Sequence, residues 1–207
     1  MLYLIGGAPR CGKTTVARRV AASMCCSRLP ADYLSTAFSN YIPAAELAAR
    51  YPAWATATVD DRYARYTSAE VIGIYRTRAA TTWPGLRDLL SYAAHDRHAM
   101  VVEGYHLEPG WLAEFGRTHA AFPIRTLVLV RADAAQLALD LRRSTDPTDW
   151  VLCSAREDVT FARVAQMVCD YSAWFAAEAM RHGLDVYAMD GDYNTAVAGA
   201  VRELTAS

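Results

Sequence analysis

The segment Gly7-Ala8-Pro9-Arg10-Cys11-Gly12-Lys13-Thr14 matches the pattern G-x-x-x-x-G-K-[S/T] at every fixed position. Its glycines allow successive backbone N–H groups to turn inward, and a helix that starts there adds the positive end of its dipole. Lys13 can then bridge two neighbouring phosphates, and the hydroxyl of Thr14 can hold Mg²⁺. The segment therefore predicts a phosphate-binding loop in which these eight residues and Thr15 surround a nucleotide.

The sequence on either side of this loop fits that interpretation. The apolar run at residues 2–5 predicts a buried strand that leads into the loop. After the loop, Val16, Val20 and Met24 recur at i, i+4 and i+8, which predicts an amphipathic helix. A strand, a glycine-rich turn and a helix in this order are the context that a phosphate-binding loop requires.

The composition excludes several other classes of protein. The chain has 207 residues, 53% of them hydrophobic and 21% charged, which is a normal balance for one folded domain. The net charge of −1, without long runs of like charge, argues against a nucleic-acid or membrane-surface partner. No stretch approaches the ~20 apolar residues that cross a bilayer, and the N-terminal apolar run is too short for a signal peptide. Five cysteines without a C-x-x-C pair favour a reduced, cytoplasmic setting, and the oligomeric state stays open.

Short apolar runs alternate with helical patterns along the whole chain, as in βαβ units. We expect strands at residues 2–5, 28–32, 99–103, 125–130 and 185–189. We expect helices at 13–24 and 43–51, after the capping box at Thr67, from Pro84 onward, at 133–142 and at 156–182. These elements predict a three-layer α/β sandwich of the P-loop NTPase type, with a five-stranded parallel sheet, in a single domain over 1–207. Residues 41–98 are expected to form a helical insert that covers an acceptor site, and residues 142–156 a lid.

Two acidic residues are candidates for chemistry beside the loop. Glu103 ends the apolar run at 99–102 and should lie at the carboxyl edge of the sheet, where it could hold Mg²⁺ or orient an acceptor. Asp32 is expected at the end of the second strand, where its carboxylate could accept the proton of an attacking hydroxyl. The alternatives are a solvent-facing glutamate at a strand end and an aspartate that caps a turn.

Arginines near the expected lid are the third candidates. Arg142 and Arg143, with Arg156 in reserve, could neutralise the charge on a phosphoryl group in transfer. An equally good interpretation is that the pair stabilises the C-terminus of its helix. Only one of the 21 basic residues is a lysine, Lys13, which suggests that a compact ammonium is needed there.

The segment Val102-Glu103-Gly104-Tyr105-His106-Leu107-Glu108-Pro109-Gly110 resembles the E-G-x-H-L-x-P-G stretch of 2-phosphoglycerate kinases. The glycine-rich loop from Gly6 to Thr14 is similar to theirs, and zeta-toxin-like and uridine-kinase-like enzymes share the looser strand-Glu-Gly feature. The resemblance implies a P-loop α/β sandwich that uses ATP and Mg²⁺. The family pattern has an arginine a few residues after its strand-two aspartate, whereas Asp32 is followed by 33–38 without one. That departure argues against a phosphorylated acceptor and for a neutral one, such as a nucleoside, a sugar or an antibiotic.

These features together predict an ATP-dependent kinase that acts on a hydroxyl of a small molecule, with Lys13, Asp32, Glu103, Arg142 and Arg143 as catalytic residues and Thr14 and Glu103 at the metal. A regulatory GTPase would need the motifs D-x-x-G and N-K-x-D, which do not occur. A nucleotide-binding switch, or an ATPase without a small-molecule acceptor, is the remaining alternative. Such a protein would have no need of an acceptor-activating carboxylate.

Overall fold

The computed structural model describes residues 1–144 and 150–206. Strands and helices alternate as the sequence predicts, with additional helices between them. The elements in chain order are β1 (Leu2–Gly7), α1 (Lys13–Ser23), β2 (Ser27–Pro30), α2 (Ala31–Ser39), α3 (Ala44–Arg50), the 3₁₀ helix η1 (Pro52–Ala55), α4 (Val59–Arg65), α5 (Ser68–His95), β3 (Met100–Glu103), α6 (Pro109–Thr118), β4 (Ile124–Val130), α7 (Ala134–Arg143), α8 (Trp150–Ser154), α9 (Asp158–Arg181), β5 (Val186–Ala188) and α10 (Tyr193–Thr205).

The strands form one parallel sheet in the order β2-β3-β1-β4-β5. Glu103, the last residue of β3, is in register with Ile5 of β1 on one side and with Pro30 of β2 on the other. Parallel strands present their carboxyl ends at one edge, so the residues that follow these three strands meet there. The predicted five-stranded parallel sheet is confirmed.

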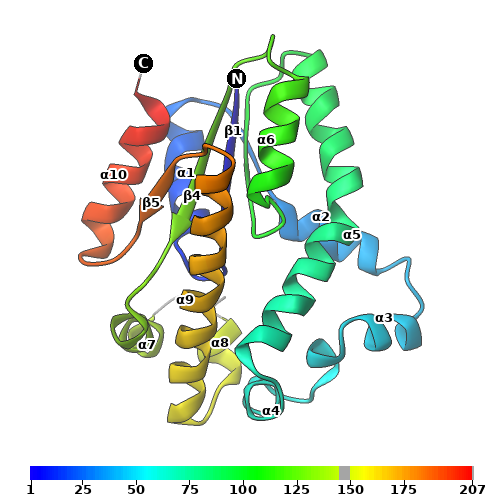
Figure 1. The fold of residues 1–207 in the computed structure, drawn as a ribbon, viewed down its shortest axis with the longest axis vertical. Coiled ribbons are helices and arrows are strands. Elements are labelled where there is room, and N and C mark those ends of the chain that lie inside the picture. The colour runs from blue at the N-terminus through cyan, green and yellow to red at the C-terminus, as the bar shows by residue number, and fades with distance from the viewer. Residues whose placement is uncertain (145–149, 207) are drawn as a thin grey trace.

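Helices cover both faces of the sheet and give the predicted three layers (Figure 1). Helices α1 and α10 pack together on one face, whereas α5, α6 and α9 contact one another on the other face. Alternate residues of β1 pack on opposite faces of the sheet. Leu2 and Leu4 pack in one core cluster with Leu86 and Leu90 of α5, whereas Tyr3 and Ile5 belong to the larger core cluster that includes α1. The sheet is thus buried on both faces, which explains the nearly continuous apolar runs of its central strands.

The second strand is shorter than the sequence predicts. β2 ends at Pro30, and α2 begins at the next residue, so that Asp32 lies in the first helical turn and not at a strand end. Pro30 has extended backbone angles and precedes the helix as its N-cap residue. A carboxylate in the first turn of a helix is stabilised by the helix dipole, which is a reason for an aspartate at this place.

Helix α5 is one continuous element where the sequence predicts two. The capping box is confirmed, because the Thr67 hydroxyl accepts from the Glu70 amide and the Glu70 carboxylate accepts from the Thr67 amide. Pro84 lies inside the helix rather than at its start. An internal proline costs about 3 kcal/mol, but burial of Trp83 and Leu86 next to it holds the two halves together. Figure 1 shows the helix change direction near its middle, as a proline predicts.

The chain between β2 and β3 is entirely helical or turn-like, from α2 to α5, which agrees with the character predicted for residues 41–98. The expected lid at 142–156 lies partly outside the described residues, since 145–149 are not described. Helices α2, α4, α6, α8 and α10 and the 3₁₀ helix η1 were not predicted from the sequence. Among the described residues, no helix is long and apolar enough to cross a membrane.

Candidate nucleotide and acceptor site

The phosphate-binding loop connects the end of β1 to the start of α1, as predicted. Gly12 precedes the helix with φ +80°, and Gly7 has φ +133° with its Cα so close to the Leu129 carbonyl that a side chain would overlap it. Glycine is required at both positions for that reason. The Lys13 ammonium is buried and donates to the carbonyl oxygen of Ala8 at 2.6 Å, which closes the loop on itself.

Several side chains of the loop anchor it to the rest of the protein. Ala8 and Cys11 are fully buried, so only their backbone can face a phosphate. The Cys11 sulfur lies 3.4 Å from the Ser172 hydroxyl of α9, and burial raises the pKa of this thiol. Thr15 accepts a hydrogen bond of 2.9 Å from the Tyr193 hydroxyl of α10. The loop is therefore fixed from two helices that are distant in the sequence.

Thr14 and Glu103 meet as the sequence predicts. The Thr14 hydroxyl donates to Oε1 of Glu103 at 3.0 Å, and Arg28 of β2 donates to the same oxygen at 3.0 Å. Only 2% of Glu103 is exposed. Its burial raises the pKa of the carboxyl, against the opposing effects of Lys13, the Thr14 hydrogen bond and Arg28. Arg28 was not anticipated from the sequence, because nothing local distinguishes it from the other arginines.

These groups fit a magnesium site of a particular kind. Among the described residues, no three His, Cys, Asp or Glu side chains gather into a metal cluster. Mg²⁺ often takes only one or two protein oxygens and completes its shell with water and substrate phosphates. The hydroxyl of Thr14 and the carboxylate of Glu103 supply such a pair beside the phosphate-binding loop.

Asp32 lies near the same group of charges although it follows the strand by two residues. Its charge acts on Glu103, and the charges of Lys13 and Arg78 act on it. Asp32 is exposed to solvent, but the protein atoms around its carboxyl raise the pKa of this group, and the two cations oppose that rise. The structure thus brings Lys13, Asp32 and Glu103 together at the carboxyl edge of the sheet.

Arg78 of α5 is a cation that the sequence did not identify. Its Nη2 donates to the Ser35 hydroxyl of α2 at 3.1 Å, and its guanidinium lies 5.3 Å from the ring of Tyr51 and 5.7 Å from that of Trp54. It is 46 residues from Asp32 in the chain, so no local motif could reveal the pairing. The position that lacks an arginine after Asp32 therefore has a cation nearby, supplied by the helical insert.

The two candidate arginines at the end of α7 are not joined to this group. Arg142 pairs with Asp158 at the start of α9, with Nε 3.2 Å from Oδ1, and also donates to the Asp158 carbonyl at 2.9 Å. Within the described ranges, no contact links Arg142 or Arg143 to the phosphate-binding loop. The backbone amide of Arg156 donates to Asp60 at 2.8 Å, which ties α4 to the chain before α9.

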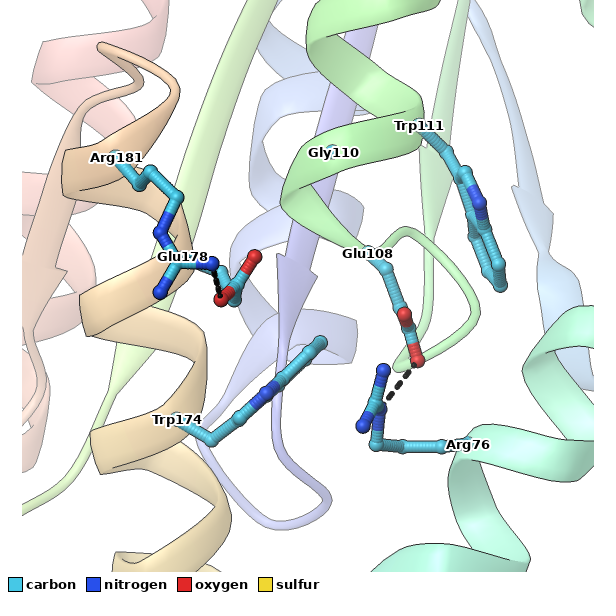
Figure 2. A pocket seen from close by; sticks show the side chains of 7 residues that line it. All are labelled: Arg76, Glu108, Gly110, Trp111, Trp174, Glu178 and Arg181. Carbon is cyan, nitrogen blue, oxygen red and sulfur yellow. Dashed lines mark hydrogen bonds and ion pairs between the residues drawn. The ribbon is translucent and has the colours of Figure 1, made fainter.

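A separate pocket of about 410 Å³ lies between α5, α6 and α9. Figure 2 shows Arg76 of α5 and Glu108 pointing toward each other, with Nε and Oε1 3.3 Å apart, and the ring of Trp174 from α9 beside Arg76. Residues two apart on a helix do not face the same way. Arg76 therefore belongs to this pocket, whereas Arg78 belongs to the group around Asp32.

Comparison with known proteins shows the fold. No protein-family model and no curated protein sequence matches this chain. A shikimate kinase structure from Bacteroides thetaiotaomicron aligns with a TM-score of 0.52 and 15% identity, covering 99% of this chain and 96% of that one. A gluconokinase structure from Sinorhizobium meliloti 1021 aligns with a TM-score of 0.50 and 12% identity, covering 98% and 90%. The fold is that of the P-loop kinases. At these identities the likeness establishes the fold alone.

Proposed function

We propose that this protein is an ATP-dependent phosphotransferase that moves the γ-phosphate onto a hydroxyl of a small molecule. The observation that carries the proposal is the meeting of Thr14, Glu103 and Asp32 beside a complete phosphate-binding loop. A protein that only binds nucleotide has no use for a second carboxylate on the acceptor side. The names of the two structural neighbours, shikimate kinase and gluconokinase, agree with a small-molecule acceptor.

Each residue has a role in this proposal. Lys13 contacts the β- and γ-phosphates, and its present bond to Ala8 shows that the ammonium points into the loop. Mg²⁺, held by Thr14 and by Glu103, would neutralise charge on the phosphates. Asp32 orients the acceptor hydroxyl and takes its proton late, because a loose transition state demands little of a base. Arg142 and Arg143 remain candidates for a lid contact that forms with substrate.

The positive charges beside Asp32 indicate which class of acceptor the site would bind. Lys13 and Arg78 both act on this carboxylate, and the Arg78 guanidinium lies among Ser35, Tyr51 and Trp54. A guanidinium is well suited to bind a carboxylate or phosphate group. The sequence predicts a neutral acceptor because no arginine follows Asp32, but Arg78 supplies that charge from another segment. We therefore favour an acceptor that carries an acidic group, among which the resemblance nominates 2-phosphoglycerate.

A coupled ADP-release assay with paired acceptors tests the proposal. The acids are 2-phosphoglycerate, gluconate and shikimate, and the neutral compounds are glucose, uridine and an uncharged antibiotic with a free hydroxyl. Stimulation of ADP release by one of the six, with phosphate recovered on that compound, is the expected result. Turnover that is unaffected by all of them would instead support a nucleotide switch or a simple ATPase. Stimulation by a neutral compound alone would retain the kinase and overturn the acidic acceptor.

A further inference from the structure

His106 is a buried side chain that the proposed reaction has not yet used. It lies in the loop between β3 and α6, three residues after Glu103, and none of its surface is exposed. Neither ring nitrogen has a hydrogen-bond partner among the described residues. Buried polar groups in native proteins are nearly always paired, and an unpaired one costs free energy of folding. An imidazole with two unpaired nitrogens therefore calls for a partner that arrives from outside the protein.

The surroundings place this imidazole next to the acceptor side of the site. A Cβ atom built on Gly104 would lie 3.1 Å from Nδ1 of His106 and 2.9 Å from Cβ of Ala31, so the ring lies close to the start of α2. Its plane stacks on Tyr105, with the ring centroids 3.9 Å apart. The charges of Arg78 and Lys13 both act on it. These are the same two cations that act on Asp32.

The imidazole is uncharged at neutral pH. Burial lowers the pKa of His106 to about 3, and the positive charges of Arg78 and Lys13 add to this effect. A neutral imidazole offers one N–H donor and one acceptor nitrogen. It can therefore recognise a hydroxyl or another polar oxygen, but it cannot serve as a cation for phosphate, and it is too weak a base to compete with Asp32.

We propose that His106 determines acceptor specificity by forming a hydrogen bond to a polar oxygen of the acceptor other than the hydroxyl that is phosphorylated. This inference rests on the proposed function and narrows its substrate class: the acceptor carries at least two oxygen groups, one for Asp32 and one for His106. No solvent reaches the ring in this conformation. The contact therefore requires the protein atoms around the ring to move when the acceptor enters.

Three variants separate a specificity role from a structural one. His106→Phe keeps a ring to stack on Tyr105 and removes both nitrogens, and His106→Gln restores a donor and an acceptor. His119→Phe is the matched control, because His119, the C-cap residue of α6, also stacks on a ring, that of Phe115 at 4.1 Å, but is partly exposed and hydrogen-bonded. We measure melting temperature, ATP-analogue affinity, and KM and kcat for those of 2-phosphoglycerate, gluconate and shikimate that are turned over.

We expect His106→Phe to melt at the parent temperature or above, since it loses only unpaired polar atoms. Its acceptor KM should rise at least tenfold with unchanged ATP-analogue affinity, and His106→Gln should recover part of that loss. The parameters of His119→Phe should stay within twofold. A lower melting temperature with a parallel fall in all kinetic parameters would show a structural role and overturn the inference, as would an unchanged acceptor KM.

Imidazole ¹⁵N spectra keep this test separate from that of the proposed function. The His106 signals, assigned by their loss in His106→Phe, should shift when an acceptor that is turned over is added to the complex with Mg²⁺ and a non-hydrolysable ATP analogue. Turnover without such a shift overturns the role of His106 and leaves the kinase intact. If no compound stimulates ADP release, the proposed function fails. If, in addition, none of the three acids shifts the His106 signals, the inference about His106 fails as well.

Discussion

The proposed donor side and the proposed acceptor side of this site are built in different ways. The donor side is a contiguous segment, residues 7–15, in which Cys11, Lys13 and Thr15 are hydrogen-bonded within the loop or to neighbouring helices. The acceptor side is assembled from Asp32 of α2, Arg78 of α5 and His106 after β3. Nε of Arg78 and both ring nitrogens of His106 are buried without a hydrogen-bond partner among the described residues. A site that always binds the same phosphates can be complete in itself. A site that selects one acceptor can leave its polar groups to be paired by that acceptor.

The largest effect should come from the donor side. Replacing Lys13 by alanine should lower phosphotransfer by at least ~10²-fold, since no other lysine exists in the chain to supply the phosphate contact. Lys13→Arg is the sharper control, because a guanidinium keeps the charge but not the compact shape that reaches Ala8 at 2.6 Å. The measurement is ADP release at saturating ATP. If Lys13→Ala is nearly as active as the parent, this loop is not the site that binds the phosphate donor.

Glu103→Gln should have the next largest effect, a loss of about 10- to 100-fold that excess Mg²⁺ partly restores. The variant removes the charge but keeps the shape and the Thr14 contact. A magnesium titration of the rate checks this result. An unchanged magnesium dependence would leave Glu103 only its structural pairing with Arg28.

The stability of Glu103→Gln should also depend on pH in a different way from that of the parent. Burial raises the pKa of Glu103 above its ordinary value of 4.5, so the folded protein holds this proton more tightly than the unfolded chain. Stability is therefore lost as the pH rises through the folded-state pKa, and the glutamine variant lacks that loss. The melting temperature of Glu103→Gln minus that of the parent should be more positive at pH 8 than at pH 4. A difference of the opposite sign would mean that Arg28 and Lys13 outweigh the burial.

On the acceptor side, Asp32→Asn should lower kcat by about 10-fold while the affinity for an ATP analogue stays the same. A loose transition state needs its base mainly for orientation, which is the reason for a smaller effect than at Lys13. Asp88→Asn, an exposed aspartate of α5 that pairs with Arg87, is the matched control. An equal loss in both variants would point to a general effect of charge on the protein.

The smallest effects should come from the end of α7. Arg143→Ala should lower kcat with little change in ATP affinity if Arg143 reaches the phosphates from a lid. Arg142→Ala should instead lower stability by less than about 1 kcal/mol, because its ion pair with Asp158 is largely exposed. Rate and melting measurements on both variants decide between the roles. If Arg143→Ala leaves kcat unchanged, the helix-dipole interpretation stands for Arg143.

The sequence predicts the donor side well because the motif is local. Gly7 and Gly12 are required by the backbone of the loop, and the strand and helix around the loop carry clear apolar periodicity. Glu103 could be foreseen for the same reason, as the three buried residues Met100 to Val102 lead into it. The sheet order and the β2-β3-β1 register then place Glu103 beside the loop without any information from side chains.

The acceptor side could be predicted only in part because its contacts are tertiary. Helix α2 begins at Ala31, where the sequence predicts a strand, so Asp32 lies in this helix. Packing of Trp83 and Leu86 overrode the break expected at Pro84, so that Arg78 and the residues after the proline share one helix. Neither Arg28 nor Arg78 carries a local signal, since their roles depend on residues 75 and 46 positions away.

The pairing of Lys13 with Ala8 has a practical consequence for measuring site occupancy. The chain contains a single side-chain amine, and that amine lies inside the loop proposed to hold the nucleotide, with only 7% of its residue exposed. An amine-reactive reagent therefore has one lysine to label in the whole molecule. The labelled fraction of the one peptide that contains Lys13, measured by mass spectrometry at increasing nucleotide concentration, would report the fraction of loops that nucleotide protects. The measurement needs no fluorophore, no engineered residue and no knowledge of the acceptor.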